Sequence, residues 1–409
     1  MYQKNSKKLW IVSELYYPEA TATGYILTNL AEGLAAKAIS VSVLCSQPTY
    51  SARGIRAPSC EKRNKVNIHR CLGTTLDKDI FLFRIFNLIT ITFSLFLKSI
   101  FLFKRSDNVL VVTNPPSLPF LVAIACRLRG AKCVLLIHDV YPEILTIVGK
   151  LSSANILACG FKWFNRKLYN SVKRIVVLGR DMQNLVIDKI DKKKEKVSVI
   201  TNWADIEQVV PVRRTNNSLL KELRFQDKFV IGYAGNIGYP NDVDVIIDAA
   251  VRLSTSNDFH FLFIGSGIKK RCIEKAIMHK RLSNITLLPN RPRDDQVNFL
   301  NACDVAIVSL VAGMKGVSVP SRIYNIMAAG KPIIAIVDSQ SEVALVIGEE
   351  SIGWTIQPNN PDKFVKIIHK AKSNPRLLQE MGKRARMVAK TKYSYENALN
   401  AYYSLFQNL

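Results

Sequence analysis

Residues 229–253 read FVIGYAGNIGYPNDVDVIIDAAVRL, and the order of residue types in them decides the fold. An apolar run rich in β-branched residues comes first, a glycine-bearing turn follows, and an amphipathic helical pattern closes the stretch. A strand, a turn and a helix in this order begin a βαβ unit. Such units build parallel sheets whose two faces are covered by helices.

The same alternation extends over the rest of the chain. Because 409 residues exceed what one hydrophobic core usually supports, we expect two α/β domains. An amphipathic helix is predicted over residues 23–38. The apolar runs predict strands at residues 8–15, 40–45, 108–113, 132–138, 174–179, 196–200, 259–265, 284–288, 304–310 and 332–337.

The polar stretch between Asp205 and Asp227 is predicted to be an interdomain linker. We therefore expect an N-terminal domain at residues 1–205 on the acceptor and membrane side. A second domain at residues 206–385 is expected to bind the ligand, and a terminal helix is expected at residues 386–409.

Cysteine and histidine usage argues against a metal site. The eight cysteines form no C-x-x-C pair, and the five histidines are dispersed, so we expect buried free thiols in a reducing compartment and no metal. The N-terminus lacks the apolar core of a signal peptide, which predicts a cytoplasmic protein.

Positive charge is concentrated in the first half of the chain. Residues 1–205 contain 30 Lys and Arg against 14 Asp and Glu, a balance of +16 out of the total of +25. This excess predicts a polyanionic partner, either a nucleic acid or an anionic membrane. No helix-turn-helix, zinc-finger or RNP-like pattern occurs, so we expect no nucleic acid as partner.

Residues 81–105 favour the membrane. As a helix they place Arg84, Asn87, Ser94 and Lys98 on one stripe opposite a wide Phe/Leu/Ile face, the pattern of a helix lying in a membrane interface. Their longest uncharged stretch is 13 residues, short of the roughly 20 that span a bilayer. The alternative is a core helix of the α/β domain.

Ligands of parallel α/β sheets lie beyond the carboxyl ends of the strands. In the first half, Gly24 opens a helix there. His138 with Asp139 follows another strand, an arrangement suited to hydrogen-bonding a sugar hydroxyl or the leaving oxygen, so we expect these two residues to be catalytic. The alternatives are an ordinary helix start and a structural His-Asp pair. Asn202 belongs to the polar corner TNWAD that ends the domain.

In the second half, three turns open towards one edge. Together they predict a pocket for a nucleotide diphosphate, with Ser321 as the N-cap of a helix and Arg322 and Lys315 supplying positive charge. A glycine turn by itself is weak evidence, because such turns commonly connect a strand to a helix. The residues concerned are Gly235, Asn236 and Gly238, then Gly265 and Gly267, then Lys315, Pro320, Ser321 and Arg322.

These motifs resemble a known family. YYPEATATG, HDVYPE, TNWAD, GYAGNIG, FIGSG and PSRIYNIMAAGKPIIA, in this order and spacing, resemble the family 4 glycosyltransferases of GT-B fold. The bacterial WbuB-like and WcaI-like subgroup, which builds surface polysaccharides, is the most similar. The resemblance implies two Rossmann-like, doubly wound domains facing each other, with a final helix that crosses back to the first domain.

The resemblance also implies an activity. It is the retaining transfer of a hexose from a UDP- or GDP-linked sugar, without metal or other cofactor, to a lipid-linked or oligosaccharide acceptor. Such an enzyme is expected on the inner face of the plasma membrane, held there by residues 81–105. The alternatives are a catalytically silent nucleotide-sugar-binding subunit and a sugar-nucleotide epimerase or hydrolase.

Residue roles follow from the same resemblance. Gly24 is placed near the donor diphosphate and His138 near the donor sugar. Asn236, Gly238 and the backbone of residues 320–322 are placed around the phosphates. The nucleobase pocket is assigned to Gly265 and Gly267.

Two departures from the family pattern bear on recognition. Many members carry two glutamates where this chain has Val317 and Asn325, so a neutral amide is expected to contact the ribose. Many members also carry two basic residues near the phosphates after GNIG, whereas this chain has Tyr239, Asn241 and Asp242 in that stretch. We therefore expect Arg322 and Lys315 to supply the positive charge instead.

Overall fold

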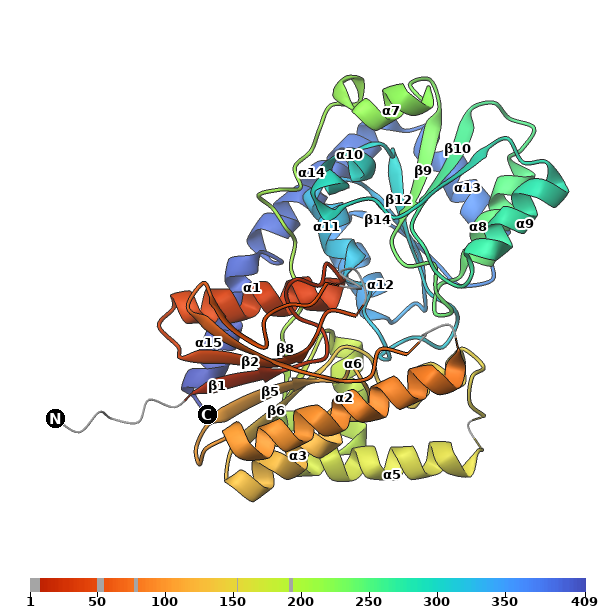
Figure 1. Ribbon diagram of the computed structural model, residues 1–409. Coiled ribbons are helices and arrows are strands. Elements are labelled where there is room, and N and C mark those ends of the chain that lie inside the picture. The colour runs from red at the N-terminus through yellow and green to blue at the C-terminus, as the bar shows by residue number, and fades with distance from the viewer. Residues whose placement is uncertain (1–7, 50–54, 77–79, 153, 191–193) are drawn as a thin grey trace. The chain divides into compact units, whose positions relative to one another are not determined.

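The computed structural model describes residues 8–49, 55–76, 80–152, 154–190 and 194–409. The chain forms two compact units, each built on its own sheet (Figure 1). The first unit comprises residues up to Pro142, Ser153–Thr201 and Ala398–Leu409. The second comprises Glu143–Ser152 and Asn202–Asn397.

The sheet of the first unit has eight strands in the order β3-β4-β2-β1-β5-β6-β7-β8. All neighbouring strands are parallel except β3, which pairs antiparallel with β4 at one edge. The central strands are buried along their whole length, as their uniformly apolar sequences predict. The strands are β1 (Leu9–Val12), β2 (Val41–Ser46), β3 (Cys60–Arg63), β4 (Val66–Cys71), β5 (Asn108–Val112), β6 (Lys132–Ile137), β7 (Arg174–Val177) and β8 (Val197–Val199).

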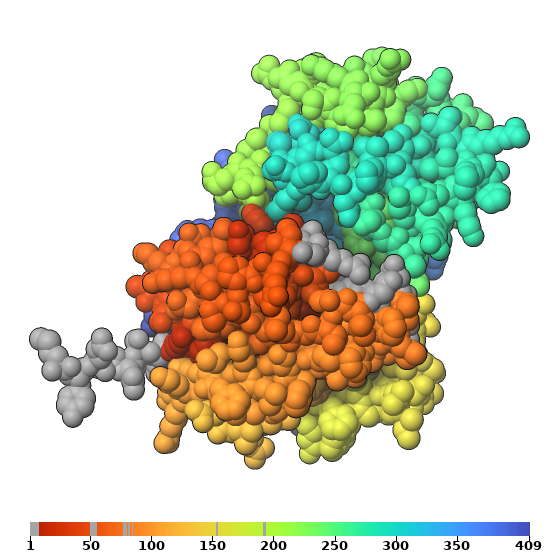
Figure 2. Space-filling model, in the orientation of Figure 1, coloured from red at the N-terminus to blue at the C-terminus, as the bar shows by residue number. Residues whose placement is uncertain are grey.

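Three helices of the first unit lie side by side on one face of its sheet, with α3 between α2 and α5 (Figure 1). Their surfaces adjoin on the face of the unit that Figure 2 shows. The helices of this unit are α1 (Ala22–Ala36), α2 (Phe81–Leu102), α3 (Leu118–Arg129), α5 (Ile156–Ser171) and α6 (Arg180–Lys189), with the short η1 (Lys194–Lys196). All but the first residues of α15 (Tyr395–Gln407) belong to this unit as well.

Helix α2 is the predicted helix of residues 81–105, and it turns polar side chains inward. Asn87 is buried, where its Oδ1 accepts from Thr74 Oγ1 at 2.8 Å and its Nδ2 donates to the Leu76 carbonyl at 2.8 Å. Ser99 is also buried. The face opposite is apolar and exposed, with Leu82, Phe83, Ile85, Phe86, Ile89, Phe93, Leu97 and Phe101 at the surface.

The structure revises the length estimate for this helix. The window Ile85–Leu102 has a mean hydropathy of 1.9 and is, by length and composition alone, apolar enough to cross a bilayer, although it contains Lys98. The prediction had considered only the uncharged 13 residues. Because Ile91, Leu95 and Ser99 are packed inside the first unit, α2 is also an element of its fold.

The sheet of the second unit has six parallel strands in the order β11-β10-β9-β12-β13-β14. Its core contains the apolar faces of α8 and α13 and the inner side chains of the strands. The strands are β9 (Phe229–Ala234), β10 (Phe259–Ile264), β11 (Ile285–Leu288), β12 (Val305–Ser309), β13 (Ile333–Ile336) and β14 (Gly353–Ile356).

The helices of the second unit follow the alternation that the sequence predicts. They are α4 (Glu143–Ile147), α7 (Ser218–Leu223), α8 (Val243–Arg252), α9 (Lys270–Lys280), α10 (Gln296–Asn301), α11 (Arg322–Ala328), α12 (Glu342–Glu350), α13 (Pro361–Lys372) and α14 (Pro375–Thr391), with the short η2 (Arg214–Asn216) and η3 (Arg293–Asp295). The α/β class with two parallel-sheet domains is thus confirmed.

The stretch after Asp205 is a folded part of the second unit and not a free linker. It contains η2 and α7, whose Leu219 and Leu220 are buried. Arg214 donates from Nη1 to both carboxylate oxygens of Asp304 at 2.8 Å. Polar composition misled the prediction here, because Arg214 finds its partner in Asp304 of the second unit and the two leucines pack inward.

Candidate active site

Two glycine turns interlock at the carboxyl ends of β9 and β10. The Gly235 amide donates to the Ile264 carbonyl at 2.9 Å, and the Ile237 amide donates to the Ser266 carbonyl at 2.8 Å. A Cβ at Gly265 would lie 2.0 Å from the Gly235 carbonyl oxygen, and Gly265 has a positive φ of 155°. The backbones approach so closely that glycine is required there.

Gly267 is required for the same reason. A Cβ on it would lie 2.4 Å from the Ile237 carbonyl oxygen and 2.7 Å from Asn236 Oδ1. The two turns therefore form one rigid ledge of backbone, which we call the glycine ledge (residues 235–238 and 265–267). The close packing explains why both turns carry glycine without invoking a nucleobase.

Arg322, the first residue of α11, covers the glycine ledge. Its guanidinium carbon lies 4.6 Å from the centre of the Tyr233 ring and would lie 3.2 Å from a Cβ on Gly235. Nη2 donates to the Asn236 carbonyl at 3.2 Å and to Asn241 Oδ1 at 3.3 Å. These contacts hold the guanidinium in one orientation.

The other terminal nitrogen of Arg322 is not satisfied. Nη1 is buried and has no hydrogen-bond partner among the described residues. A buried donor without an acceptor is costly, and more so when it is charged. An anionic oxygen placed beside the glycine ledge would complete the hydrogen bonding of this nitrogen.

The Asn236 carbonyl is the centre of the supporting network. Besides Arg322, Tyr233 Oη donates to it at 2.8 Å and Asn241 Nδ2 donates to it at 3.0 Å. Burial raises the pKa of Tyr233, so its hydroxyl stays protonated and acts as a donor. Tyr233 and Asn241 thus position Arg322, and the sequence analysis assigned this role to neither of them.

Gly238 and the residues after it complete the turn. Gly238 is buried, and a Cβ on it would lie 3.0 Å from the side-chain nitrogen of Asn236. Asp242 caps α8 by accepting from the Val245 amide at 3.4 Å. Asp242 is a structural residue here, and burial raises the pKa of its carboxyl.

The loop of residues 310–321 carries Lys315 and Pro320 to the start of α11. Lys315 is exposed, its ammonium donates to Gln340 Oε1 at 2.5 Å, and its amide donates to Asp338 at 3.0 Å. Pro320 is half-buried, and its carbonyl accepts from Ile323. The described contacts of Lys315 therefore differ from those of Arg322: the Lys315 ammonium donates to Gln340, whereas the Arg322 guanidinium donates to the Asn236 carbonyl of the glycine ledge.

Ser321 differs from its predicted role. It occupies the N-cap position of α11, but its backbone is helical (φ −63°, ψ −18°) and its side chain makes no capping hydrogen bond. An N-cap hydroxyl reaches the helix amides from an extended backbone, which Ser321 does not have. The Tyr324 amide instead donates to the Ser321 carbonyl at 3.3 Å.

Asn325 is engaged inside the second unit. Its Oδ1 accepts from the Asp205 amide at 2.8 Å, and its Nδ2 donates to Gln296 Oε1 at 2.7 Å. The residue is 9% exposed, and Val317 at the other departure from the family pattern is buried. Both ends of the Asn325 amide thus serve the fold, and the predicted contact with a ribose is not prepared in this structure.

Asn202 belongs to a segment that contacts residues 393–395, at the start of α15. It is buried, and the Ala204 amide after it donates to the Tyr393 carbonyl at 2.7 Å. Trp203 packs against Tyr395 with their ring centres 5.4 Å apart. These contacts give the TNWAD motif a structural role within the second unit.

The first unit brings Gly24 and His138 to the carboxyl edge of its own sheet. His138 follows β6, its amide donates to Thr113 Oγ1 at 3.1 Å, and its Nδ1 lies 3.5 Å from Thr23 Oγ1. The Asp139 amide also reaches Thr113 Oγ1, at 3.4 Å. Sequence reasoning missed Thr23 and Thr113 as neighbours of these residues. Thr23 comes directly before Gly24, and Thr113 comes directly after β5.

Gly24 is fixed by the start of α1. Its amide donates to the Thr21 N-cap oxygen at 3.1 Å, and a Cβ on it would lie 2.6 Å from the Glu19 carbonyl oxygen. This close approach of backbone requires glycine. The neighbouring Thr23 then faces His138, so the structure does place the Gly24 turn beside the histidine.

His138 is neutral at physiological pH. Burial lowers its pKa to about 4, and Nε2 is buried without a hydrogen-bond partner among the described residues. A neutral imidazole offers one donor and one acceptor. The site can therefore exchange a hydrogen bond with a hydroxyl group of a ligand.

No group of three or more His, Cys, Asp or Glu side chains that could hold a metal occurs in the part of the chain that the structure describes. The eight cysteines are free, and five of them are buried: Cys45, Cys71, Cys126, Cys133 and Cys303. In the second unit the candidate residues are the glycine ledge and the guanidinium of Arg322, and in the first unit they are Gly24 and the imidazole of His138.

Comparison with known proteins identifies the family. Residues 24–208 match the model described as Glycosyltransferase Family 4, and residues 216–388 match Glycosyl transferases group 1. A Pseudomonas aeruginosa protein named as the glycosyltransferase WbjE is 30% identical over 88% of both chains. A protein of Escherichia coli K12 named for colanic acid biosynthesis, the glycosyl transferase WcaI, is 24% identical over 97% of this chain and 98% of its own.

Two further relatives are informative. The Escherichia coli UDP-Gal:alpha-D-GlcNAc-diphosphoundecaprenol alpha-1,3-galactosyltransferase is 25% identical over 70% of this chain and 71% of its own. The crystal structure of Anabaena HepE in complex with UDP-glucose shares the fold, with a TM-score of 0.73 at 14% identity over 98% of this chain and all of its own. The predicted resemblance is confirmed: the chain belongs to the family 4 glycosyltransferases with the GT-B fold.

Proposed function

We propose that this glycosyltransferase moves a sugar from a nucleotide-diphosphate sugar to a lipid-linked saccharide during synthesis of a surface polysaccharide, with retention and without a metal ion. Binding of the nucleotide-diphosphate donor is inferred from one observation, the buried Nη1 of Arg322 beside the glycine ledge, which has no hydrogen-bond partner among the described residues. A phosphate oxygen satisfies such a nitrogen best, because charge-assisted hydrogen bonds are roughly twice as strong as neutral ones.

The geometry supports catalysis by stabilising the leaving group. When the bond between the sugar and the diphosphate breaks, negative charge grows on the departing oxygen. A guanidinium already held by the Tyr233 ring and the Asn236 carbonyl meets that charge without reorganising. Retention without an enzymic nucleophile also requires the acceptor to attack on the face that the diphosphate leaves.

His138 is proposed to contact the donor sugar. Its imidazole is neutral at pH 7 and its Nε2 is buried and unpartnered, so a sugar hydroxyl can complete its hydrogen bonding. Its Nδ1 lies near Thr23 and its amide is held by Thr113, which fixes the ring at the end of β6. We assign it a substrate-contacting role, with Asp139 as its neighbour in the turn.

Relatives guide the choice of donor and acceptor. UDP is the preferred nucleotide, since HepE was crystallised with UDP-glucose and a relative is named for UDP-Gal, while GDP is the alternative. That relative's acceptor is a sugar on diphosphoundecaprenol, which supports a lipid-linked acceptor here. WcaI, named for colanic acid biosynthesis, supports a surface polysaccharide as the product.

The apolar outer face of α2 supports attachment to the inner face of the plasma membrane. Phe101 is 81% exposed and Phe93 is 53% exposed, and large exposed apolar patches mark interaction surfaces. In a vesicle co-sedimentation assay, Phe93→Ser with Phe101→Ser should weaken binding while donor affinity is unchanged. Equal sedimentation of variant and wild type would remove α2 from the membrane contact.

A second function is favoured by one observation. Asn325 is engaged by Asp205 and Gln296, and Val317 is buried, so neither position that often carries a glutamate presents a group to the donor sugar. A nucleotide-sugar-binding subunit without transferase activity would tolerate both changes. This possibility predicts donor binding with no product.

One experiment decides between the two. Calorimetry with UDP-, GDP- and dTDP-sugars identifies the donor, and a product assay with lipid-linked acceptors in the presence of EDTA tests transfer. We expect binding of a UDP-sugar, transfer that EDTA does not reduce, and an anomeric configuration in the product that equals that of the donor by NMR. Binding without product from any acceptor supports the silent subunit, and turnover without an acceptor supports a hydrolase or epimerase.

A further inference from the structure

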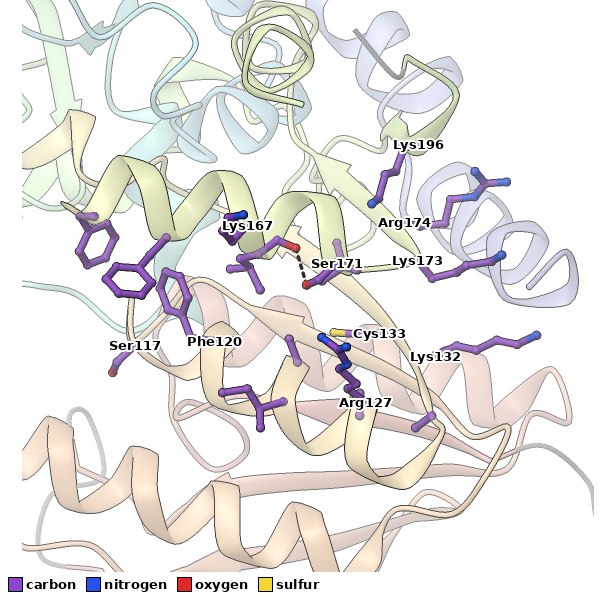
Figure 3. Close-up of a pocket in the computed structure, with 18 of the residues that line it drawn as sticks. Ser117, Phe120, Arg127, Lys132, Cys133, Lys167, Ser171, Lys173, Arg174 and Lys196 are labelled. Carbon is purple, nitrogen blue, oxygen red and sulfur yellow. Dashed lines mark hydrogen bonds between the residues drawn. The ribbon is translucent and has the colours of Figure 1, made fainter. Parts of the chain in front are cut away.

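A cavity lies in the first unit, between α3 and α5 (Figure 3). Its volume is about 1140 Å³, larger than the roughly 300–1,000 Å³ of most small-molecule pockets. Aromatic and aliphatic side chains from both helices line one part of it, and Phe120 stacks edge to face on Phe161 with ring centres 5.7 Å apart. The apolar lining comprises Phe120, Ala123, Ile124, Phe161, Phe164 and Leu168.

The other part of the cavity is positively charged. In Figure 3, Phe120 lies towards one end, while Lys132, Lys173, Arg174 and Lys196 gather at the other and Arg127 points in from α3. The cationic residues that line the cavity are Arg127, Lys132, Lys167, Lys173, Arg174 and Lys196, and Glu195 is the one acid among the lining residues. Such a shape, apolar at one end and cationic at the other, is complementary to an anionic amphiphile.

The surface around the cavity has the same character. The sequences of α2, α3 and α5 contain no Asp or Glu, and the surfaces of these helices adjoin in Figure 2. Apolar side chains next to the cavity are exposed, among them Leu128, Ile156 and Trp163. A surface of helices without acids that combines exposed apolar side chains with lysine and arginine is suited to an anionic membrane.

We propose that this cavity, the α3–α5 groove, binds one anionic phospholipid of the bilayer. An acyl chain lies between Phe120 and Phe164, and the phosphate lies against Arg127, Lys173 and Arg174. The described contacts leave these cations available: Arg174 donates only to the Glu195 carbonyl, at 2.9 Å, and no ion pair of Arg127 or Lys173 occurs among the described residues.

The proposed lipid is not the sugar acceptor in its reactive position. The cations of the groove lie at the amino ends of β6 and β7, whereas His138 follows the carboxyl end of β6. Six residues of strand separate these ends by about 20 Å. A phosphate held in the groove therefore leaves the candidate active site free, so lipid binding and donor binding can be tested separately.

The test uses a soluble single-chain lipid, so that α2 and a bilayer do not contribute. Lysophosphatidylglycerol and lysophosphatidylcholine of the same chain length are titrated into the full chain below their micelle concentrations, by calorimetry and by tryptophan emission. Trp163 reports on the groove because it is exposed and packs on Phe164 with ring centres 4.9 Å apart. We expect the anionic lipid to bind at least tenfold more tightly than the zwitterionic one.

Three variants test whether the lipid binds in the α3–α5 groove. Arg127→Gln combined with Arg174→Gln should weaken lysophosphatidylglycerol binding about thirtyfold, since each cation near an anionic lipid contributes about 1 kcal/mol and the two together about 2 kcal/mol. Ala123→Phe, which fills the groove from a half-buried position on α3 without changing charge, should weaken it similarly. Lys162→Gln is the matched control, because this lysine is exposed on α5 and does not line the groove.

Several outcomes would overturn the proposal. They are equal binding of the two lipids, unchanged binding in Ala123→Phe, or inorganic phosphate alone displacing the lipid at equal concentration. Loss of lipid binding in the Lys162→Gln control would also count against it. Donor titration of the same variants separates this inference from the proposed function, because UDP-sugar affinity should be the same in all of them.

Discussion

Helices α8 and α2 use their apolar side chains in opposite ways. In α8, Val243, Val245, Ile246 and Ile247 are all buried in the core of the second unit. In α2, Phe83, Phe86, Phe93 and Phe101 are exposed, whereas Asn87 is buried and hydrogen-bonded. The contrast separates side chains whose interactions are completed inside the fold from side chains whose interactions are not, and the second kind marks surfaces and sites that await a ligand.

The same contrast holds for polar groups. Asn325 has both ends of its amide hydrogen-bonded within the second unit. Arg322 Nη1 and His138 Nε2 are buried and have no hydrogen-bond partner in the described parts of the chain. Substitution of a completed group should lower stability, whereas substitution of an incomplete group should lower binding.

The largest effect is expected at Ile246. Ile246→Ala removes a fully buried side chain from the α8 core and should lower the free energy of unfolding by about 2–5 kcal/mol. Phe93→Ala on α2 is the matched change at an exposed apolar side chain. It should lower the free energy of unfolding by less than about 1 kcal/mol, because half of this ring is already in water. Urea unfolding followed by circular dichroism measures both free energies. Equal losses of stability in the two variants would contradict the distinction between α8 and α2.

Arg322→Ala should act on binding. Loss of a charged hydrogen bond to the diphosphate is expected to raise the dissociation constant of the donor by about tenfold or more, corresponding to about 1.5–3 kcal/mol. Lys315→Ala is the control, since its ammonium donates to Gln340 and not to the glycine ledge. Calorimetry that gave Arg322→Ala the affinity of the wild type would exclude this residue from the donor site.

Asn325→Ala should act on stability instead. It leaves the Asp205 amide and Gln296 without their partners, which should cost about 1–3 kcal/mol in chemical unfolding. Donor affinity, measured where the variant is fully folded, should stay within a factor of two of the wild type. A variant of wild-type stability with tenfold weaker donor binding would instead place Asn325 at the ribose.

The smallest effect concerns pH. The pKa of His138 is lowered to about 4 in the folded chain, against an ordinary value near 6.5, so the unfolded chain takes up the proton first. Its contribution to stability is therefore complete above pH 6.5 and is lost as pH falls towards 4, by about 1 kcal/mol between pH 7 and 5.5. Comparison of unfolding curves at these two pH values for wild type and His138→Gln measures it.

His260 provides the internal comparison. Burial also lowers its pKa to about 4, and its Nε2 lies 2.9 Å from Thr286 Oγ1, so it is a completed group. His260→Gln should flatten the same pH dependence. Donor binding at pH 7 should fall only in His138→Gln, and an equal fall in both variants would remove His138 from the site.

Much of the fold was predictable from the sequence, because uniformly apolar runs identify strands buried on both faces. The β3–β4 hairpin edge was missed, since β3 reads CEKR and its side chains are exposed or half-buried. The role of the stretch after Asp205 was also missed. Periodicity shows which residues share a face of a helix, but the direction of that face depends on the neighbours, so only the structure shows that Asn87 is buried in the first unit.

The candidate site was predictable in part. Glycines at the ends of β9 and β10 indicated where backbone comes close, and the structure brings them together with Arg322. The partners of Asn325 and the missing side-chain cap of Ser321 depend on backbone angles and on residues more than 20 positions away. Tyr233 could have been found from its place in the motif, as an aromatic ring within the strand that ends at the glycine turn.

The unpaired nitrogen of Arg322 has a consequence for turnover. A cation that recognises the diphosphate meets the same oxygens in the donor and in the nucleoside diphosphate that remains after transfer. We therefore expect the free nucleoside diphosphate to be a competitive inhibitor with an affinity near that of the donor. Nucleoside diphosphate that accumulates would then occupy the free enzyme in competition with the donor, so the rate of transfer depends on how fast the cell removes this product.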